Sequence, residues 1–253
     1  MLALERQQKI LEILNAEGSV LVSRLSHEMS VTEETVRRDL EKLEAKEQLR
    51  RTHGGALPIS GGSYELSLEK RKNLNVEIKE ALAQKAVEQI ASGDSIFLDA
   101  STTTFYMARY IRNLRNITVI TNSLRAINEL TGIEGIKVIA PGGIVSSNQS
   151  LVGAAAEGFL AENYYADKMF FSSKGIGSNS IILEGNEQEY QIKQRMIKNS
   201  GKCYYLCDKS KIGRVGYMKL ASFKDVDCLI TDAEISGHLK DTLDEENVKI
   251  IRV

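Results

Sequence analysis

The sequence predicts an α/β protein in two parts: a small N-terminal unit of three helices and a β-wing, then a larger domain with a mainly parallel sheet. Three observations predict this order. Apolar residues recur at helical spacing in three successive segments of residues 1–45. From Val76 onward, short apolar strands alternate with helices, as in parallel sheets covered on both faces. Residues 59–74 are rich in glycine, serine and charge, so we expect domains at 1–58 and 75–253 joined by a linker at 59–74.

Apolar faces mark the first two helices of the N-terminal unit. The first helix is expected to end at Gly18, and Ser30-Val31 leaves room only for a tight turn after the second. The residues that define the two faces are Ile10, Ile13, Leu14, Val22, Leu25 and Met29.

The run from Val31 to Glu44 predicts a third helix with one apolar and one polar face. At about 100° per residue, Val36, Leu40 and Leu43 share the apolar stripe. One face can therefore enter a core and the other the major groove of DNA. Thr32 is placed to cap this helix. The candidate DNA contacts here are Thr32, Thr35, Arg37, Arg38 and Lys42.

The segment from Leu49 to Pro58 is typical of a β-wing. Arg50 and Arg51 can lay positive charge along phosphates, and the glycine pair that follows allows φ values closed to other residues. These three helices and the wing make a winged helix-turn-helix. Its wing adds the candidate DNA contacts Arg50, Arg51 and His53.

Two observations favour a plainer interpretation of the same arginines. Glu34 lies four residues before Arg38, the order of an ordinary surface ion pair that contributes only about 0.3–0.5 kcal/mol. Residues 1–57 carry nine basic and ten acidic side chains, so the unit is not a basic tail. DNA affinity must then come from local placement, and a winged helix that contacts protein is the alternative.

The ordered motifs resemble a known family. ERQQKILEIL, SVLVSRLSHEMSVTEETVRRDLEKLE and LRRTHGGAL are similar to the N-terminal signature of the DeoR family of bacterial transcriptional regulators, over nearly all of residues 1–57. The resemblance implies that this unit binds double-stranded operator DNA.

Composition fits a protein without a membrane segment. The 253 residues are 42% hydrophobic with a net charge of −1, enough for two domains with ample cores. Apolar runs stay below the roughly 18 residues that span a bilayer, and the N-terminus lacks the order of a signal peptide, so we expect a cytoplasmic protein. Cys203, Cys207 and Cys228 lack a CxxC spacing and are expected to be buried free thiols; we expect no metal and no cofactor.

The larger domain is expected to place a ligand at the carboxyl ends of its strands. Strands are predicted at 95–98, 117–120, 137–139, 168–171, 203–206, 228–230 and 249–253, and helices at 76–90, 104–112, from 124, 154–162, 187–200 and 236–243. The loop from Asp99 to Thr104 sets hydroxyls over the amides of a helix N-terminus, which favours an anion such as phosphate. Simple capping by Ser101 or Thr102 is the alternative. Polar or glycine-rich ends recur at 121–123, 141–143, 172–175 and 207–211.

This half resembles the DeoR-family C-terminal domain, a relative of ribose-5-phosphate isomerase that senses a phosphorylated sugar. LDASTTT, VITNS, Gly142-Gly143, the Gly153 turn, FFSSKGI, NEQEYQIKQRMI and DKSKIGR carry the resemblance. It implies an effector pocket of Asp99, Ser101, Thr102, Thr103, Thr121, Asn122, Gly142, Gly143, Lys174 and Gly175, with Glu187, Lys193, Asp208 and Lys209 in matching motifs. Many relatives carry small residues at the position of Lys174, so the identity of the effector does not transfer.

We therefore expect a sugar-phosphate-responsive regulator that represses carbohydrate catabolic genes and leaves its operator when a phosphorylated sugar binds. Paired half-sites predict a homo-oligomer, either a dimer or a tetramer, held by the larger domain. The alternative is a sugar-phosphate isomerase-like enzyme with a DNA-binding appendage. Asp99, Lys174, Glu187 and Asp208 are residue types that an aldose–ketose isomerase uses for proton transfer. The family resemblance implies binding without turnover.

Overall fold

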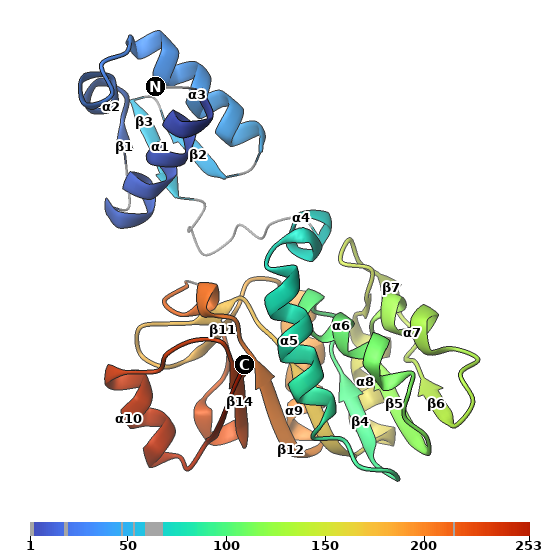
Figure 1. The fold of residues 1–253 in the computed structure, drawn as a ribbon. Coiled ribbons are helices and arrows are strands. Elements are labelled where there is room, and N and C mark those ends of the chain that lie inside the picture. The colour runs from blue at the N-terminus through green and yellow to red at the C-terminus, as the bar shows by residue number, and fades with distance from the viewer. Residues whose placement is uncertain (1–2, 18–19, 47, 53, 59–67, 215) are drawn as a thin grey trace. The chain divides into compact units, whose positions relative to one another are not determined.

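The computed structural model describes residues 3–17, 20–46, 48–52, 54–58, 68–214 and 216–253 (Figure 1). The chain divides into two compact units, Met1–Tyr64 and Glu65–Val253, and each is described by itself. No helix of the described residues is long and apolar enough to cross a membrane.

The N-terminal unit has the predicted winged helix-turn-helix order. Its elements are α1 (Ala3–Glu17), β1 (Val20–Leu21), α2 (Val22–Glu28), α3 (Glu33–Ala45), β2 (Leu49–Thr52) and β3 (Gly55–Pro58), and the strands form an antiparallel sheet in the order β1-β3-β2. The predicted apolar stripe of α3 is confirmed, because Val36, Leu40 and Leu43 are buried in the core. A Cβ at Gly55 would overlap the carbonyl oxygen of Val20, so glycine lets β3 approach β1.

A buried polar contact fixes α1 against α3. Asp39, on the third helix, is buried and forms an ion pair with Arg6. Gln7 donates from Nε2 to Asp39 Oδ1 at 3.0 Å, and Lys46 Nζ donates to Gln7 Oε1 at 3.3 Å. A buried carboxylate needs such partners, because an unpaired one is strongly destabilising. Asp39 therefore holds the unit together rather than facing DNA.

The larger unit is built on a seven-stranded parallel sheet in the order β15-β14-β12-β9-β4-β5-β6 (Figure 1). The strands are β4 (Ser95–Leu98), β5 (Ile117–Thr121), β6 (Ile136–Ile139), β9 (Ala166–Phe171), β12 (Ser200–Leu206), β14 (Cys228–Thr231) and β15 (Lys249–Arg252). The chain runs outward from β4 to β6 and then returns to β9 beside β4. Ligands bind at such a switch point, beyond the carboxyl ends of the strands.

Helices cover both faces of this sheet, as predicted. One core includes apolar side chains of α5 (Val76–Val87), α6 (Thr102–Ile111) and α7 (Leu124–Leu130). The other includes side chains of α8 (Ala154–Asn163), α9 (Glu187–Lys198) and α10 (Gly237–Glu245). The three cysteines are buried free thiols, and burial raises the pKa of Cys203 and Cys207 to about 12.

Short elements outside the main sheet were not predicted. These are the hairpin β7 (Ile144–Val145) and β8 (Leu151–Val152), and an antiparallel sheet of β10 (Gly175–Ile176), β11 (Ile182–Glu184) and β13 (Met218–Ala221). Two 3-10 turns, η1 (Lys209–Lys211) and η2 (Phe223–Asp225), complete the unit. Strands of two or three residues, such as β7, β8, β10 and β11, are too short to show a period of two.

The expected linker is partly helical. Its residues 59–67 lie outside the described part of the chain, whereas Leu68–Asn73 form helix α4. Leu68 is buried, and Tyr106 of α6 donates its hydroxyl to the carbonyl of Lys72 at 3.0 Å. These contacts help to dock this charged segment on the larger unit.

Candidate DNA-binding face and effector site

The arginines of α3 lie on its exposed side, each beside a glutamate one turn earlier. Arg37 Nη2 is 2.8 Å from Glu33 Oε2, and Arg38 Nε is 3.4 Å from Glu34 Oε1. The expected Glu34–Arg38 pair is confirmed. Lys42 is exposed on the same helix. Exposed pairs contribute at most about 1 kcal/mol, so a phosphate or a base can replace the glutamates at little cost.

The two candidate threonines serve the helix start. The Thr32 hydroxyl accepts a hydrogen bond from the Thr35 amide at 3.3 Å, which confirms the predicted cap. The two hydroxyls lie 2.9 Å apart. Both residues remain on the surface, so capping explains Thr32 without a DNA contact.

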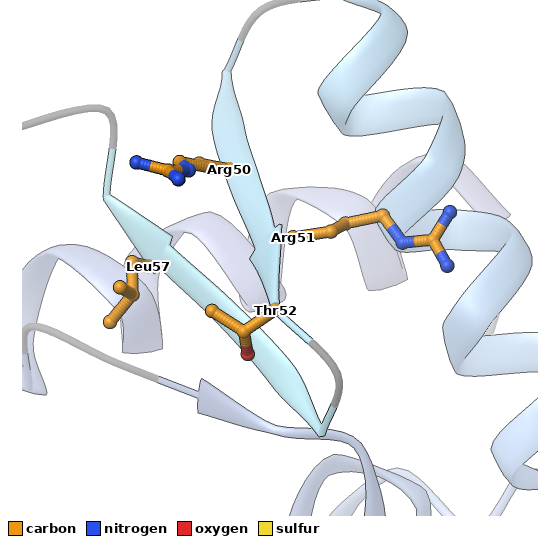
Figure 2. A pocket seen from close by; sticks show the side chains of 4 residues that line it. All are labelled: Arg50, Arg51, Thr52 and Leu57. Atoms are coloured by element: carbon orange, nitrogen blue, oxygen red, sulfur yellow. The ribbon is translucent and has the colours of Figure 1, made fainter.

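The wing presents its two arginines in opposite directions. Figure 2 shows Arg50 and Arg51 leaving β2 on either side, beside an open hollow that Thr52 and Leu57 also line. Arg51 Nη1 lies 2.8 Å from Glu41 Oε1 of α3, while Arg50 is exposed. Arg51 therefore links the wing to α3, and Arg50 is the exposed arginine of the wing. His53 lies outside the described residues.

Asp99 organises the switch point of the parallel sheet. Its Oδ1 accepts from the Ser101 amide at 3.2 Å and from Thr104 Oγ1 at 2.6 Å. Its Oδ2 accepts from the Ser172 amide at 3.2 Å and lies 3.3 Å from Lys193 Nζ. Asp99 thereby ties the end of β4 to the end of β9, and both of its oxygens already have partners.

Lys193 is the buried cation at the centre of this network. Its Nζ donates to Glu184 Oε2 at 2.6 Å and to the Ser172 carbonyl at 2.8 Å. Although burial by itself lowers the pKa of Lys193, Glu184 and Asp99 raise it above its ordinary value. Burial raises the pKa of nearby Glu189, which accepts a hydrogen bond from Ser150. Lys193 therefore stays charged and structurally engaged.

Two predicted effector residues keep buried acceptors without partners. In the described part of the chain, Thr103 Oγ1 and Asn122 Oδ1 are buried and form no hydrogen bond. The amide of Asn122 is oriented by its Nδ2, which donates to the Leu151 carbonyl at 3.3 Å. An unsatisfied buried polar atom costs about 1–3 kcal/mol, so these two oxygens mark a place where a ligand can donate hydrogen bonds.

Other predicted residues of the same edge are occupied by local contacts. Ser101 caps α6 through the Thr104 amide at 3.2 Å, which realises the capping alternative and starts the helix two residues before the predicted position. Thr121 donates to the Leu98 carbonyl at 2.6 Å and accepts from the Ser123 amide at 3.1 Å. Thr102 is buried beside them. These residues shape the edge of the site.

The predicted glycines have structural reasons of their own. A Cβ at Gly143 would lie 2.6 Å from the carbonyl oxygen of Val152, and Gly143 has a φ of +134°. A Cβ at Gly175 would overlap the carbonyl oxygen of Lys211. Gly142 and Gly143 are exposed, whereas Gly175 is buried. Close backbone approach explains Gly143 and Gly175.

Four charged candidates are separated by the structure. Lys174 is half-buried near Gly185, and Asp208 is buried, where its carboxylate accepts from the Ser210 amide at 3.0 Å. Glu187 and Lys209 are exposed. The structure does not bring these two into the buried network.

The inward-facing lysine of the DKSKIGR motif is Lys211 instead of Lys209. Lys211 Nζ donates to Ser172 Oγ at 2.6 Å and to the Ser173 carbonyl at 3.1 Å. Likewise the inward acids are Glu184 and Glu189 instead of Glu187. A helical period of 3.6 places Glu189 with Lys193 and could have found it.

Three further cations near this edge come from distant segments: Arg71 of α4, Lys79 of α5 and Arg125 of α7. Lys79 Nζ donates to the Leu74 carbonyl at 2.6 Å and also to the Arg71 carbonyl. Burial, together with the nearby Lys211 charge, lowers the pKa of Lys79 to about 8. No spacing in the sequence relates these positions, so only the fold could identify them.

Both units match described families. Residues 6–61 match the DeoR-like helix-turn-helix domain, and residues 74–233 match the DeoR C terminal sensor domain. The HTH-type transcriptional regulator YulB of Bacillus subtilis (strain 168) is 43% identical over 254 residues, 100% of this chain and 98% of that protein. The glycerol-3-phosphate regulon repressor of Escherichia coli (strain K12) is 31% identical over 248 residues, 97% of each chain.

Two further matches are a regulator and the solved structure of an enzyme. The L-fucose operon activator of Haemophilus influenzae is 30% identical over 246 residues, 97% of this chain and 98% of that protein. Among solved structures, ribose 5-phosphate isomerase A from Methanocaldococcus jannaschii is 18% identical, covers 55% of each chain and has a TM-score of 0.41. The whole-length relatives are regulators, which overturns the isomerase alternative. The chain belongs to the DeoR family and is a DNA-binding transcriptional regulator, not an enzyme.

Proposed function

We propose that this regulator represses carbohydrate catabolic genes and is released from its operator by a phosphorylated sugar. The observation that carries the proposal is the pair of buried, unpartnered acceptors Thr103 Oγ1 and Asn122 Oδ1 at the carboxyl edge of β4 and β5. Sugar hydroxyls donate hydrogen bonds, and a ligand that satisfies both oxygens removes their desolvation cost. The expected ligand therefore presents hydroxyl groups to these two oxygens.

The names of the relatives support a carbohydrate-related effector. They include a glycerol-3-phosphate regulon repressor, an L-fucose operon activator and a putative aga operon transcriptional repressor of Escherichia coli O157:H7. Two of these three names are those of repressors, and we assign the same direction here. An effector releases DNA only to the extent that it prefers the DNA-incompetent arrangement.

The operator contacts are assigned to the exposed polar face of α3 and to the wing. One winged helix makes few contacts, so paired half-sites and a homo-oligomer held by the larger unit are proposed. The expected state is a dimer or a tetramer, and light scattering of the full chain at micromolar concentration distinguishes both from a monomer. The proposed DNA contacts are Thr32, Thr35, Arg37, Arg38, Lys42, Arg50, Arg51 and His53.

The test pairs each sugar phosphate with its neutral sugar in an operator-binding titration. The phosphate form should weaken operator binding and raise the melting temperature; at about a hundredfold above its dissociation constant, stabilisation should reach about 2.7 kcal/mol. Thr103→Val should remove most of this response, because it deletes the unpartnered hydroxyl and keeps the shape. Thr118→Val, at the other end of β5, should respond like the parent. Equal responses to neutral and phosphorylated sugars, or an unchanged Thr103→Val, would contradict the assignment.

A further inference from the structure

Arg125 is a half-buried residue whose guanidinium has unused hydrogen-bond donors. Its Nη2 donates to the Ala100 carbonyl at 3.4 Å, and its Cζ lies 4.5 Å from the ring centre of Phe105. Its Nε and Nη1 are buried and have no hydrogen-bond partner among the described residues. These contacts fix the plane of the guanidinium and leave two of its nitrogens without an acceptor.

Neighbouring charges leave Arg125 poorly compensated. Burial lowers its pKa and the Arg71 charge lowers it further, while Asp99 and Glu69 oppose this effect. Asp99 already accepts from Ser101, Thr104 and Ser172 and pairs with Lys193, so its oxygens are engaged elsewhere. A buried charge without hydrogen-bonded partners is destabilising, and such groups persist where a ligand completes them.

We propose that Arg125 and Arg71 form the phosphoryl subsite of the effector pocket, with Arg125 as the residue that selects a charged ligand over a neutral one. This inference rests on the proposed function and deepens it. Nε and Nη1 of this fixed guanidinium can each donate to a phosphoryl oxygen, and such charge-assisted hydrogen bonds favour arginine at phosphate sites. The hydroxyl end of the ligand then lies toward Thr103 and Asn122, on the same two strand ends.

The position of Arg71 gives this subsite a second consequence. Arg71 lies on α4, the first described helix after the segment that joins the two units, and its Nη2 donates to Asn148 Oδ1 at 2.7 Å. The carbonyls of Arg71 and Leu74 accept from Lys79, which holds the C-terminal end of α4 against α5. A dianion between Arg71 and Arg125 offsets their mutual repulsion and ties α4 to the sensor unit. Ligand occupancy thereby stabilises the segment that leads to the DNA-binding unit.

The experiment uses the full-length protein with inorganic phosphate as the probe and sodium chloride at matched ionic strength as the reference. Arg125→Gln should raise the dissociation constant of phosphate about tenfold or more, because it removes the charge and the charge-assisted hydrogen bonds of the guanidinium. Arg125→Lys keeps the charge and loses the planar guanidinium, so its dissociation constant for phosphate should lie between those of Arg125→Gln and the parent. Arg195→Gln, an exposed arginine of α9, should bind phosphate like the parent.

Melting temperatures without phosphate separate ligand binding from a structural role. If Arg125 serves to bind a ligand, its replacement should leave the melting temperature unchanged or raise it. The reason is that a functional residue with unsatisfied donors lowers the stability of the ligand-free protein. A lower melting temperature in both Arg125→Gln and Arg125→Lys would show a structural residue and overturn the inference. Parent-like phosphate affinity in folded Arg125→Lys and Arg125→Gln would overturn it as well, while leaving the proposed function intact. A parent that responds to neutral sugars and not to phosphate would contradict both.

Hydrogen exchange in α4 tests the part played by Arg71. Phosphate should slow exchange of the Leu68–Asn73 amides in the parent and in Arg195→Gln, and have no such effect in Arg125→Gln. Unchanged α4 exchange in a parent that binds phosphate would remove α4 from the subsite.

Discussion

The DNA-binding unit and the sensor unit hold their charged side chains in opposite ways. On α3 and the wing, Arg37, Arg38 and Arg51 form exposed pairs with glutamates of the same small unit. In the sensor unit, Lys193 is buried between Asp99 and Glu184. Exposed pairs are screened and exchange partners readily, whereas a buried charge depends on each partner. The first arrangement suits the surface that we propose to contact DNA phosphates, and the second gives the proposed effector site a fixed shape.

Removing the buried cation should have the largest effect. Lys193→Met leaves Asp99 and Glu184 buried without their cation, and breaking such a pair costs about 3–5 kcal/mol. Urea unfolding of the full chain should show the sensor transition at a lower midpoint, while Lys198→Met, exposed on the same helix, should shift it little. If the urea midpoint of the sensor unit were unchanged in Lys193→Met, the buried pairs would contribute no more to stability than the exposed pairs of the DNA-binding unit.

Substitutions on the DNA-binding face should change affinity and leave stability nearly unchanged. Arg38→Ala should weaken specific binding and relax base preference by about 1–3 kcal/mol if the arginine contacts a guanine edge. Arg51→Ala should weaken all sequences together and reduce the salt slope by about one unit. Titration of operator and unrelated DNA at several salt concentrations checks both. Unchanged affinity in both variants would contradict the assigned face.

The sequence was sufficient for elements whose pattern is local. The apolar run at residues 95–98 predicted β4 with its observed bounds, and the 3.6 period of Val36, Leu40 and Leu43 placed the core face of α3. Lys193 was identified through its motif, although its buried partner Glu184 was not. Local patterns therefore recover the scaffold and the strand ends.

The remaining part of the site depends on contacts between distant segments. Arg71, Arg125 and Lys211 come from α4, α7 and η1, and their approach follows from the strand order of the sheet rather than from any spacing. The choice between Lys209 and Lys211 depends on a single 3-10 turn. The hairpin of β7 and β8 has two-residue strands, too short for a period to appear.

Alkaline pH should distinguish the buried lysine Lys79 from the exposed charges of the other unit. The pKa of Lys79 is about 8 in the folded protein, below the value near 10.4 in the unfolded chain. Between these two pH values the unfolded chain binds more protons than the folded protein. The contribution of Lys79 to the free energy of unfolding therefore increases as the pH rises. The effect is at most about 1.4 kcal/mol per pH unit. Burial raises the pKa of all three cysteines, which acts in the opposite direction above about pH 8.5.

The measurement is therefore the difference between parent and Lys79→Met in the free energy of unfolding of the sensor unit, from pH 7 to pH 10. The parent should gain relative to the variant as pH rises. The groups that act on Lys79 are Lys211, Asp208, Arg71 and Arg125, and all of them remain in both proteins. A constant difference across this range would show that Lys79 has an ordinary pKa.

The smallest expected effect tests whether the surface glutamates restrain the DNA-binding arginines. Glu41→Gln removes the partner of Arg51, whose Nη1 lies 2.8 Å from Glu41 Oε1, and frees the guanidinium for phosphate. Because the pair is exposed, affinity for all DNA sequences should rise by only about 0.2–1 kcal/mol, and most at low salt. Glu12→Gln, which removes the same charge from exposed α1, is the matched control. An equal gain in both variants would mean that net charge, and not the release of Arg51, limits DNA affinity. The exposed Arg51–Glu41 pair would then not exchange its partner for DNA phosphate, contrary to the comparison between the two units.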